Sequence, residues 1–381
     1  MTDKLSPLHD EHTALGATMT PFAGWQMPLR YTSDLAEHLA VRQAAGLFDL
    51  SHMGEITVAG PDAAAFLDYA LVGAISKVRP MGARYTMICA PDGGVIDDLV
   101  VYRTGDAEYM VVANASNAPV VAAELVDRAK GFDVTLRDDS DTTALIAVQG
   151  PRAAQILQAT AGLDEDAAIA GGTAFDELKY YAAMRMRFEG EPVLVGRTGY
   201  TGEDGYEIWI DAPRAAALWR ALLAAGEPFG LVPAGLASRD SLRLEAGMPL
   251  YGNELDRTTT PFDAGLGRVV VLDKAGPDGE PADFVGRAAL AARAHAAPPR
   301  VLVGLAGETR RAARHGYAVV RGETPVGVVT SGAPSPTLGH PIAMAYVTPE
   351  VSAEGTVLAV DVRGRAEPVR VVALPFYRRP R

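Results

Sequence analysis

Apolar positions in the first 270 residues follow two spacings, one typical of amphipathic helices and one typical of strands. Helices are predicted over 8–15, 33–46, 61–71, 118–130, 153–161, 213–225 and 235–247. Strands are predicted over 47–58, 84–89, 95–102, 109–115, 142–148 and 192–196. Residues 21–28 are apolar but interrupted by Gly and two Pro, which indicates a packed loop. Strands alternate with helices but hairpins recur, so the pattern favours a mixed α+β sheet over a doubly wound parallel one.

The last part of the chain has a different pattern. Composition changes near 274–281, which indicates the edge of a linker. Short Val-rich strands separated by Gly and Pro turns are then predicted over 301–305, 317–321, 326–330, 342–346, 356–362 and 368–374. Strands at this spacing are typical of a small antiparallel barrel or sandwich.

Length, charge and cysteine content narrow the function classes. A chain of 381 residues is too long for one typical core, so two or three domains are expected. The net charge of −12 argues against a broad nucleic-acid surface. The single cysteine, Cys89, excludes an intrachain disulfide and a thiolate metal cluster within one chain. The first residues form no apolar signal core, and no apolar run approaches the roughly 20 residues of a membrane span. We therefore expect a soluble, cytoplasmic protein that makes no membrane contact.

Two carboxylates stand inside the strand predicted over 95–102. The turn 91–94, Pro-Asp-Gly-Gly, precedes it, and 84–89 is its expected hairpin partner. Because side chains alternate along a strand, Asp97 and Asp98 point to opposite faces and cannot share a proton. Either both acids are solvated near the turn, or one faces a pocket with an aromatic residue further along its own face. The local sequence leaves both interpretations open.

Other polar groups are weaker candidates. His9 and His12 have a spacing that could bind a metal, but no further ligand lies close in sequence, so a solvated helix start is expected. Asp49, Ser51 and His52 suggest a catalytic triad, yet residues this close in sequence rarely face one another and the chain has no G-x-S-x-G elbow.

Residues 197–207 contain three glycines spaced three apart, like a phosphate-binding loop. The spacing fits neither nucleotide motif, and a strand follows where those motifs require a helix. The acids of this stretch lack the calcium spacing of an EF-hand. Glu207 lies in the following strand, and its alternation with apolar neighbours fits either a solvated face or a binding role.

Eight stretches, taken in order, resemble one family. They are 22–28, 48–54, 93–98, 149–151, 197–207, 238–247, 251–253 and 330–338. Each is weak alone, but together and in register they are similar to the aminomethyltransferases of the glycine cleavage system, the T-proteins. The match runs from Leu8 to the tail 375–378.

The resemblance implies a fold of three domains around a central folate site. On this sequence the first α+β domain would comprise 1–50 plus about 140–270. A second, about 51–139, would carry the hairpin, and the C-terminal barrel would span about 280–381.

The resemblance also implies a reaction. The partner H-protein carries an aminomethyl group on its lipoyl arm. The enzyme moves the carbon to tetrahydrofolate, giving 5,10-methylene-tetrahydrofolate, ammonia and dihydrolipoyl-H-protein. No metal and no nucleic acid are required.

By the resemblance, Asp98 is the key catalytic acid and Glu207 a pterin ligand. Other positions resemble the lining of the folate site: Tyr85, Tyr102, Asn114, Tyr200, Arg239 and Arg378. The chemistry suits these residues, because a carboxylate accepts two adjacent pterin N–H groups through bonds of roughly 1.5–3 kcal/mol each. A fixed carboxylate also stabilises an iminium-like cation and manages a folate proton.

Two alternatives belong to the same fold. One is a folate-dependent demethylase that takes a methyl group from an S- or O-methyl donor. The other is a non-catalytic folate-binding accessory factor, which is marked by a Lys-Gly-Cys-Tyr-type motif. The corresponding stretch here, 243–251, has no cysteine, which argues against the accessory factor.

Overall fold

The computed structural model describes residues 3–165, 175–275 and 281–380. They form two compact units, which are described separately. The first comprises Met1–Ala64, Lys77–Arg84 and Val100–Asp240, and the second comprises Ala65–Ser76, Tyr85–Leu99 and Ser241–Arg381. The division into three domains stays a prediction.

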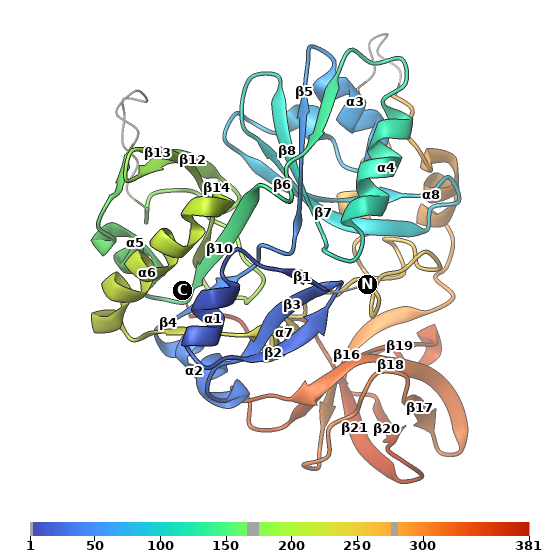
Figure 1. Cartoon of the computed structure of the whole chain (residues 1–381). Helices are drawn as coiled ribbons and strands as arrows, with labels where there is room; N and C mark the ends of the chain where they lie inside the picture. The colour runs from blue at the N-terminus through green and yellow to red at the C-terminus, as the bar shows by residue number, and fades with distance from the viewer. Residues whose placement is uncertain (1–2, 166–174, 276–280, 381) are drawn as a thin grey trace. The chain divides into compact units, whose positions relative to one another are not determined.

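A seven-stranded sheet is the centre of the first unit. Its order is β11 (Leu163–Glu165), β12 (Ala183–Phe188), β13 (Glu191–Gly196), β14 (Gly205–Asp211), β10 (Thr143–Gln149), β4 (Ala45–Asp49) and β15 (Leu231–Pro233). Neighbours are antiparallel except β15 and β4, which are parallel. Helices α5 (Ala153–Ala159) and α6 (Ala215–Gly226) pack on this sheet (Figure 1). Ile146, Ile208 and Trp219 are fully buried in the core between them.

The N-terminal segment contains a hairpin where a packed loop was expected. Strands β2 (Thr18–Phe22) and β3 (Trp25–Arg30) pair antiparallel, and β1 (Lys4–Leu5) adds to β3. The turn uses Ala23 and Gly24, both with positive φ. The loop prediction was wrong because Pro28 suggested a break, yet it lies beside a register shift, where the ladder tolerates a missing N–H. Helices α1 (His9–Ala14) and α2 (Asp34–Gln43) flank this hairpin in sequence, and Ser33 caps α2 as expected.

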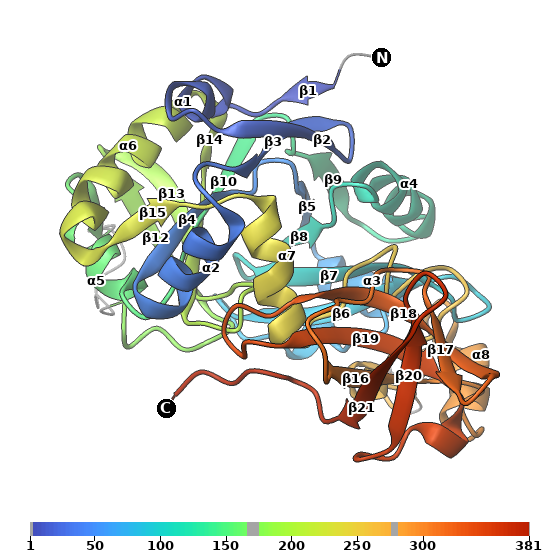
Figure 2. The ribbon, with the colours of Figure 1, turned by 90° about the horizontal axis from the view of Figure 1, so that it is seen from below.

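A five-stranded sheet contains the predicted hairpin. Its order is β6 (Ala83–Cys89), β7 (Val95–Arg103), β8 (Glu108–Ala113), β5 (Gly54–Ala59) and β9 (Thr135–Asp138). Within the first unit, helix α4 (Ala118–Arg128) packs against β5 and β9 (Figure 2). Helix α3 (Ala63–Ala70) follows β5 in the chain. The boundaries of the two units fall inside β6 and β7.

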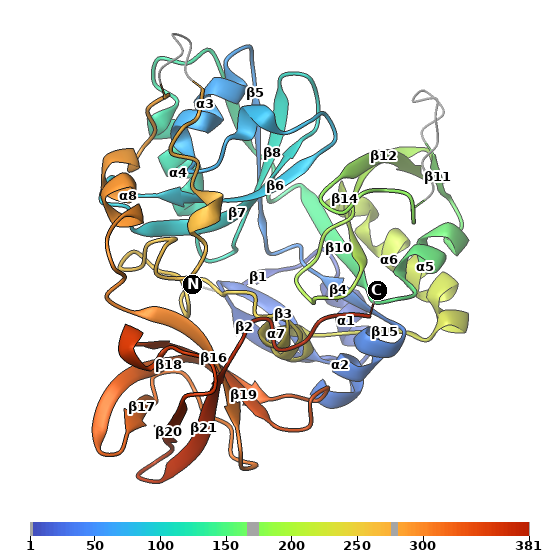
Figure 3. The same cartoon turned by 180° about the vertical axis from the view of Figure 1, so that it is seen from behind.

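The C-terminal part is a closed six-stranded barrel (Figure 2 and Figure 3). Its order is β16 (Val301–Gly307), β19 (Pro341–Val347), β18 (Thr324–Pro334), β17 (Ala318–Arg321), β20 (Val357–Asp361) and β21 (Ala366–Val372). Alternate side chains such as Leu305, Val329 and Ala345 fill its core. All six predicted strands are present, and the α+β class with a C-terminal barrel is confirmed.

Two further helices belong to the connection between sheets and barrel. They are α7 (Leu236–Glu245) and α8 (Arg287–Ala294). The predicted linker edge includes 276–280, which lie outside the described residues. Just before it, Lys274 is buried, and its ammonium donates to the carbonyls of Asp68 (2.5 Å) and Leu71, at the end of α3.

Candidate functional site

Strand β7 separates its two carboxylates as the alternation predicted. Asp97 is fully buried, together with Val95 and Leu99 on the same face. Asp98 is partly exposed, as is Val100 on its own face. The interpretation in which both acids are solvated near the turn is therefore wrong.

Asp98 accepts a hydrogen bond from a tyrosine hydroxyl. The hydroxyl of Tyr85 on β6 donates to Oδ2 of Asp98 at 3.0 Å. The Tyr85 ring packs against an apolar cluster that includes Val95 and Leu255. The second unit thus brings together two of the predicted site residues, an acid and a hydrogen-bond donor that favours its ionised form.

Glu207 is the centre of a second polar group, in the first unit. Oγ1 of Thr198 donates to Oε2 of Glu207 at 2.5 Å. The hydroxyl of Tyr102 lies 2.7 Å from Oγ1 of Thr198 and 3.5 Å from Oε2 of Glu207. Burial raises the pKa of Glu207, while the Thr198 hydroxyl and the charge of Arg239 act in the opposite direction. Glu207 is thus partly exposed, and its carboxyl group is bonded to a buried threonine instead of facing solvent alone.

Arg239 supplies positive charge to this group. Its guanidinium carbon lies 4.9 Å from the centre of the Tyr200 ring, a cation–π arrangement. Burial lowers the pKa of Arg239, and the charge of Glu207 opposes that shift. Four predicted site residues, Tyr102, Tyr200, Glu207 and Arg239, are therefore linked within the first unit.

The two remaining predicted residues have different surroundings. Asn114 directly follows β8, and its carbonyl accepts the N–H groups of Asn117 and Ala118 at the start of α4. Its side chain is partly exposed. Arg378 lies in the C-terminal tail and is exposed.

Sequence reasoning missed a buried network on β4. Nε2 of His12 lies 2.8 Å from Oδ2 of Asp49, and Nδ1 of His12 lies 2.8 Å from the hydroxyl of Tyr31. Ser6 also donates to Asp49. His12 is fully buried, so the expected solvated helix start is wrong for this residue. Asp49 and Tyr31 lie 37 and 19 positions from His12 in the chain, and no local pattern predicts such a pairing.

The rejected triad does not form. Asp49 contacts the backbone N–H of Ser51 at 2.9 Å, but its histidine partner is His12. The hydroxyl of Ser51 accepts the N–H of Leu145. His52 is buried, and burial lowers its pKa to about 4, so its ring is neutral at neutral pH.

Two of the glycines in 197–207 leave space for a neighbouring side chain. A Cβ added to Gly199 or Gly205 would lie 2.0 or 2.4 Å from side-chain atoms of Gln149. The Gln149 amide donates to the carbonyl of Thr198 at 3.0 Å and accepts from the hydroxyl of Thr201 at 3.0 Å. The two glycines therefore make room for a side chain of a neighbouring motif.

The acids of the same loop form ion pairs. Glu203 lies 2.9 Å from Arg42, and Asp204 lies 2.6 Å from Arg197. Each of these two carboxylates is thus neutralised by an arginine, so their presence in the loop does not require a bound cation. Across the part of the chain that the structure describes, no group of three His, Cys, Asp or Glu side chains could hold a metal ion. No helix among the same residues is long and apolar enough to cross a membrane.

Glu55 on β5 is a second residue that the sequence did not single out. It is 1% exposed, and neither carboxyl oxygen has a hydrogen-bond partner among the described residues. Burial, followed by the charge of Asp138, raises the pKa of Glu55 well above its usual range. Burial therefore favours the protonated form of this carboxyl group.

Comparisons with known proteins cover nearly the whole chain. The GCVT N-terminal domain matches residues 8–274, and the glycine cleavage T-protein C-terminal barrel domain matches residues 300–378. An aminomethyltransferase of Streptomyces coelicolor is 60% identical over 372 residues, which cover 97% of this chain and 96% of that protein. One of Moorella thermoacetica is 45% identical and covers 99% of each chain.

A solved structure agrees with these sequences. The glycine cleavage system aminomethyltransferase T from Bartonella henselae has a TM-score of 0.88 and 38% identity, with 99% of this chain and 98% of that chain covered. Fold and matched domains together define an α+β transferase of the T-protein class, with a C-terminal barrel. The chain belongs to the aminomethyltransferase family of the glycine cleavage system, a family that uses tetrahydrofolate. The family and the activity predicted from the eight stretches are thus confirmed.

Proposed function

We propose that this enzyme takes its aminomethyl group from the lipoyl arm of H-protein and uses tetrahydrofolate as co-substrate. The products would be 5,10-methylene-tetrahydrofolate, ammonia and dihydrolipoyl-H-protein. The proposal is supported chiefly by Glu207, a partly buried carboxylate with a hydroxyl donor and a nearby cation. Such a group is suited to bind a ligand that presents N–H donors.

Glu207 is the proposed pterin ligand. The pterin ring offers a ring N–H and an exocyclic amino group side by side, and a carboxylate accepts both. Thr198 occupies part of the capacity of Oε2, which leaves Oε1 and the remaining lone pair of Oε2 for these donors. Arg239 favours the ionised form that binding requires, and with Tyr200 it would also offer a surface to the rest of the folate.

Asp98 is the proposed catalytic acid. The aminomethyl carbon forms bonds to two folate nitrogens, while its bonds to the amino nitrogen and to the lipoyl sulfur break. The two folate protons end on ammonia and on the lipoyl thiol, and positive charge develops on the carbon during the transfer. An ionised Asp98 would stabilise this charge and accept or return the folate proton. Tyr85 fixes one carboxyl oxygen of Asp98, so the acid would need little reorientation during the reaction. No protein nucleophile and no bound metal are part of this scheme.

The variant Asp98→Asn tests the assignment. It keeps the size of the side chain and one acceptor for Tyr85 but removes the charge. Turnover with aminomethylated H-protein should fall by about 100-fold or more, the lower range for positioned acid–base help, while tetrahydrofolate binding stays near wild type. Ammonia and methylene-tetrahydrofolate are measured together.

Asp106→Asn is the matched control, because Asp106 is an exposed acid in the turn between β7 and β8. It should retain full activity. If Asp98→Asn turned over as fast as this control, Asp98 would not be the catalytic acid.

A further inference from the structure

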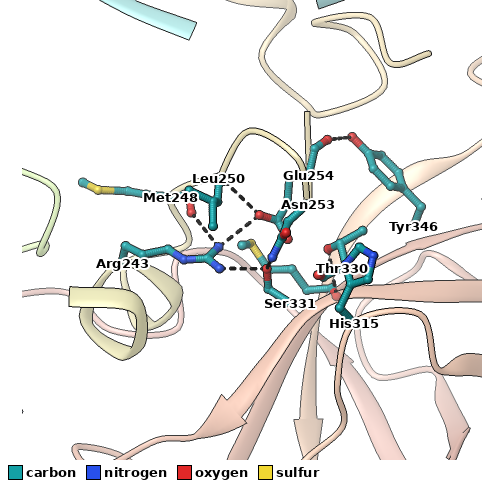
Figure 4. Close-up of polar contacts among 10 residues, drawn as sticks. Arg243, Met248, Leu250, Asn253, Glu254, His315, Thr330, Ser331 and Tyr346 are labelled. Atoms are coloured by element: carbon teal, nitrogen blue, oxygen red, sulfur yellow. Dashed lines mark hydrogen bonds and ion pairs between the residues drawn. The ribbon is translucent and has the colours of Figure 1, made fainter. Parts of the chain in front are cut away.

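Three stretches that resemble the family contain residues with no part in the proposed chemistry, and Arg243, Asn253 and Ser331 from these stretches meet at one buried ion pair. Nη1 of Arg243 lies 3.0 Å from Oε2 of Glu254, and Nη2 donates to Oγ of Ser331 at 2.8 Å (Figure 4). Nδ2 of Asn253 donates to the same Ser331 oxygen at 3.0 Å. The exposed fraction of the Arg243 side chain is 2%, and that of Glu254 is 0%. The pair therefore joins α7, the loop after it and strand β18 within the second unit.

The ion pair fixes the loop 248–255 at several points. Oε2 of Glu254 also accepts the N–H of Leu250 at 2.9 Å. The carbonyl of Glu254 accepts the hydroxyl of Tyr346 on β19 at 2.7 Å. Arg243 reaches the carbonyl of Met248 more weakly, at 3.4 Å (Figure 4). A buried pair of this kind restricts the motion of the loop, because separating the two partners would leave an unpaired charge in the interior.

The same loop holds the first residue of β7. The hydroxyl of Tyr251 donates to the carbonyl of Val95 at 3.3 Å, and the N–H of Val95 donates to the carbonyl of Thr259 at 2.9 Å. The backbone also approaches closely one residue earlier, because a Cβ on Gly94 would lie 2.1 Å from the carbonyl oxygen of Arg257. Both main-chain polar groups of Val95 are thus bonded to residues 251–259.

These contacts lie close to Asp98 along strand β7. Asp98 lies three residues after Val95 on the same strand, and the turn before Val95 contains two glycines, one with a φ of +88°. The turn is closed by its own hydrogen bonds, from the N–H of Ala90 to the carbonyl of Gly94 at 2.8 Å and from the N–H of Gly94 to Oδ1 of Asp92 at 3.0 Å. These bonds end before Val95, and the loop 251–259 bonds Val95 itself.

We propose that Tyr251, held in place by the Arg243–Glu254 pair, is a positioning residue for Asp98. This inference rests on the proposed function, in which Asp98 acts on the transferred carbon. Tyr251 does not touch the reacting atoms in this account. It sets the start of β7, so that the carboxylate bonded to Tyr85 stays where the charge develops.

The variant Tyr251→Phe is the main test because it removes a single oxygen and keeps the ring in its apolar cluster. We expect kcat with aminomethylated H-protein to fall at least fivefold, with the dissociation constant of tetrahydrofolate changed less than twofold. Glu254→Gln, which removes the anchoring charge, should produce the same split with a larger fall in kcat. Amide hydrogen exchange over 94–98 should be faster in both variants without any substrate present.

The matched control is Tyr206→Phe. Tyr206 is buried in the first unit, and its hydroxyl also donates to a main-chain carbonyl, that of Phe175, at 2.5 Å. It should lose stability without faster exchange over 94–98 and without the fall in kcat. If Glu254→Gln does not fold, Tyr251→Phe decides the question alone.

The results separate this inference from the proposed function. An inactive Asp98→Asn beside a fully active Tyr251→Phe with unchanged exchange would refute the positioning role only. A fully active Asp98→Asn would refute the catalytic assignment itself. An equal fall of kcat in Tyr251→Phe and Tyr206→Phe would show a general loss of stability and would also overturn the positioning role.

Discussion

Replacing Glu207 with Gln should weaken tetrahydrofolate binding while turnover at saturating folate changes little. The substitution keeps the shape of the side chain but turns one acceptor oxygen into an NH2 donor. Thr198 donates to Oε2 at 2.5 Å and would keep the remaining amide oxygen. The NH2 group would then face the N–H groups of the pterin, so that hydrogen-bond donors would lie opposite donors.

The size of the effect follows from these bonds. A hydrogen bond to a charged group contributes about 1.5–3 kcal/mol and a neutral one about 0.5–1.5 kcal/mol. Losing one charge-assisted bond and weakening a second therefore removes about 2–4 kcal/mol of binding free energy. At about 1.4 kcal/mol for each factor of ten, the dissociation constant should rise about 30- to 700-fold.

Equilibrium titration with tetrahydrofolate under anaerobic conditions measures this change directly. Glu191→Gln is the matched control, because Glu191 is an exposed acid on β13 of the same sheet. The pH dependence provides a second measurement. Burial raises the pKa of Glu207, so wild-type affinity should begin to fall at a higher pH than an ordinary glutamate would produce. The Gln variant should lack that acidic decline.

A rise of less than threefold in the dissociation constant would contradict the reasoning. So would an acidic decline of the same shape in the wild type and in Glu207→Gln. Either result would remove Glu207 from the pterin site while leaving the family unchanged.

Three further predictions concern the rest of the first unit. Asp49→Asn should lower the free energy of unfolding by about 3–5 kcal/mol, because it breaks a buried pair with His12; urea unfolding measures it. The pKa of Asp49 is lowered by its bonds to His12 and Ser6, so its contribution is present above its usual 3.8 and is lost as pH falls through the lower folded value. Glu55→Gln should make stability less sensitive to alkali, since the raised pKa of Glu55 costs the wild type stability as pH rises above 4.5. Gly199→Ala should displace Gln149 and destabilise by about 1–3 kcal/mol, measured as a lower thermal midpoint.

Each of these has a clear contrary outcome. The control for Asp49→Asn is Asp141→Asn, since Asp141 forms a solvent-exposed ion pair with Lys4. This variant should lower the free energy of unfolding by less than about 1 kcal/mol. Equal effects of the two would contradict the buried network. Identical pH profiles for wild-type protein and Glu55→Gln would mean that folding does not raise the pKa of Glu55. An unchanged midpoint for Gly199→Ala would mean that the loop tolerates a Cβ beside Gln149.

Local patterns were sufficient for most of the fold. The six barrel strands were predicted because each is a short Val-rich run between Gly and Pro turns, and such runs need no distant information. The opposite orientation of Asp97 and Asp98 was predicted for the same reason, as it depends only on strand alternation. The hairpin over 18–30 was missed because its two prolines outweighed the alternation around them.

Long-range pairings could not be predicted in this way. His12 looked like part of a solvated helix because Asp49 and Tyr31, its partners, are brought to it only by the folded chain. The sequence fitted a solvated face for Glu207 equally well. Its hydrogen-bond partner Thr198 lies in a loop and the nearby charge of Arg239 on a helix, and only folding brings both to Glu207. For Asp98 and Glu207 the family resemblance singled out the positions, and the structure supplied their partners.

The closure of the C-terminal barrel affects how copies of this protein meet. Every barrel strand has a neighbour on both sides, so the barrel offers no open row of N–H and C=O groups to another chain. At one end of the seven-stranded sheet, strand β15 is only three residues long. Strand addition between molecules, the usual first step of β-type aggregation, would therefore find no open edge on the barrel and little backbone to extend at β15.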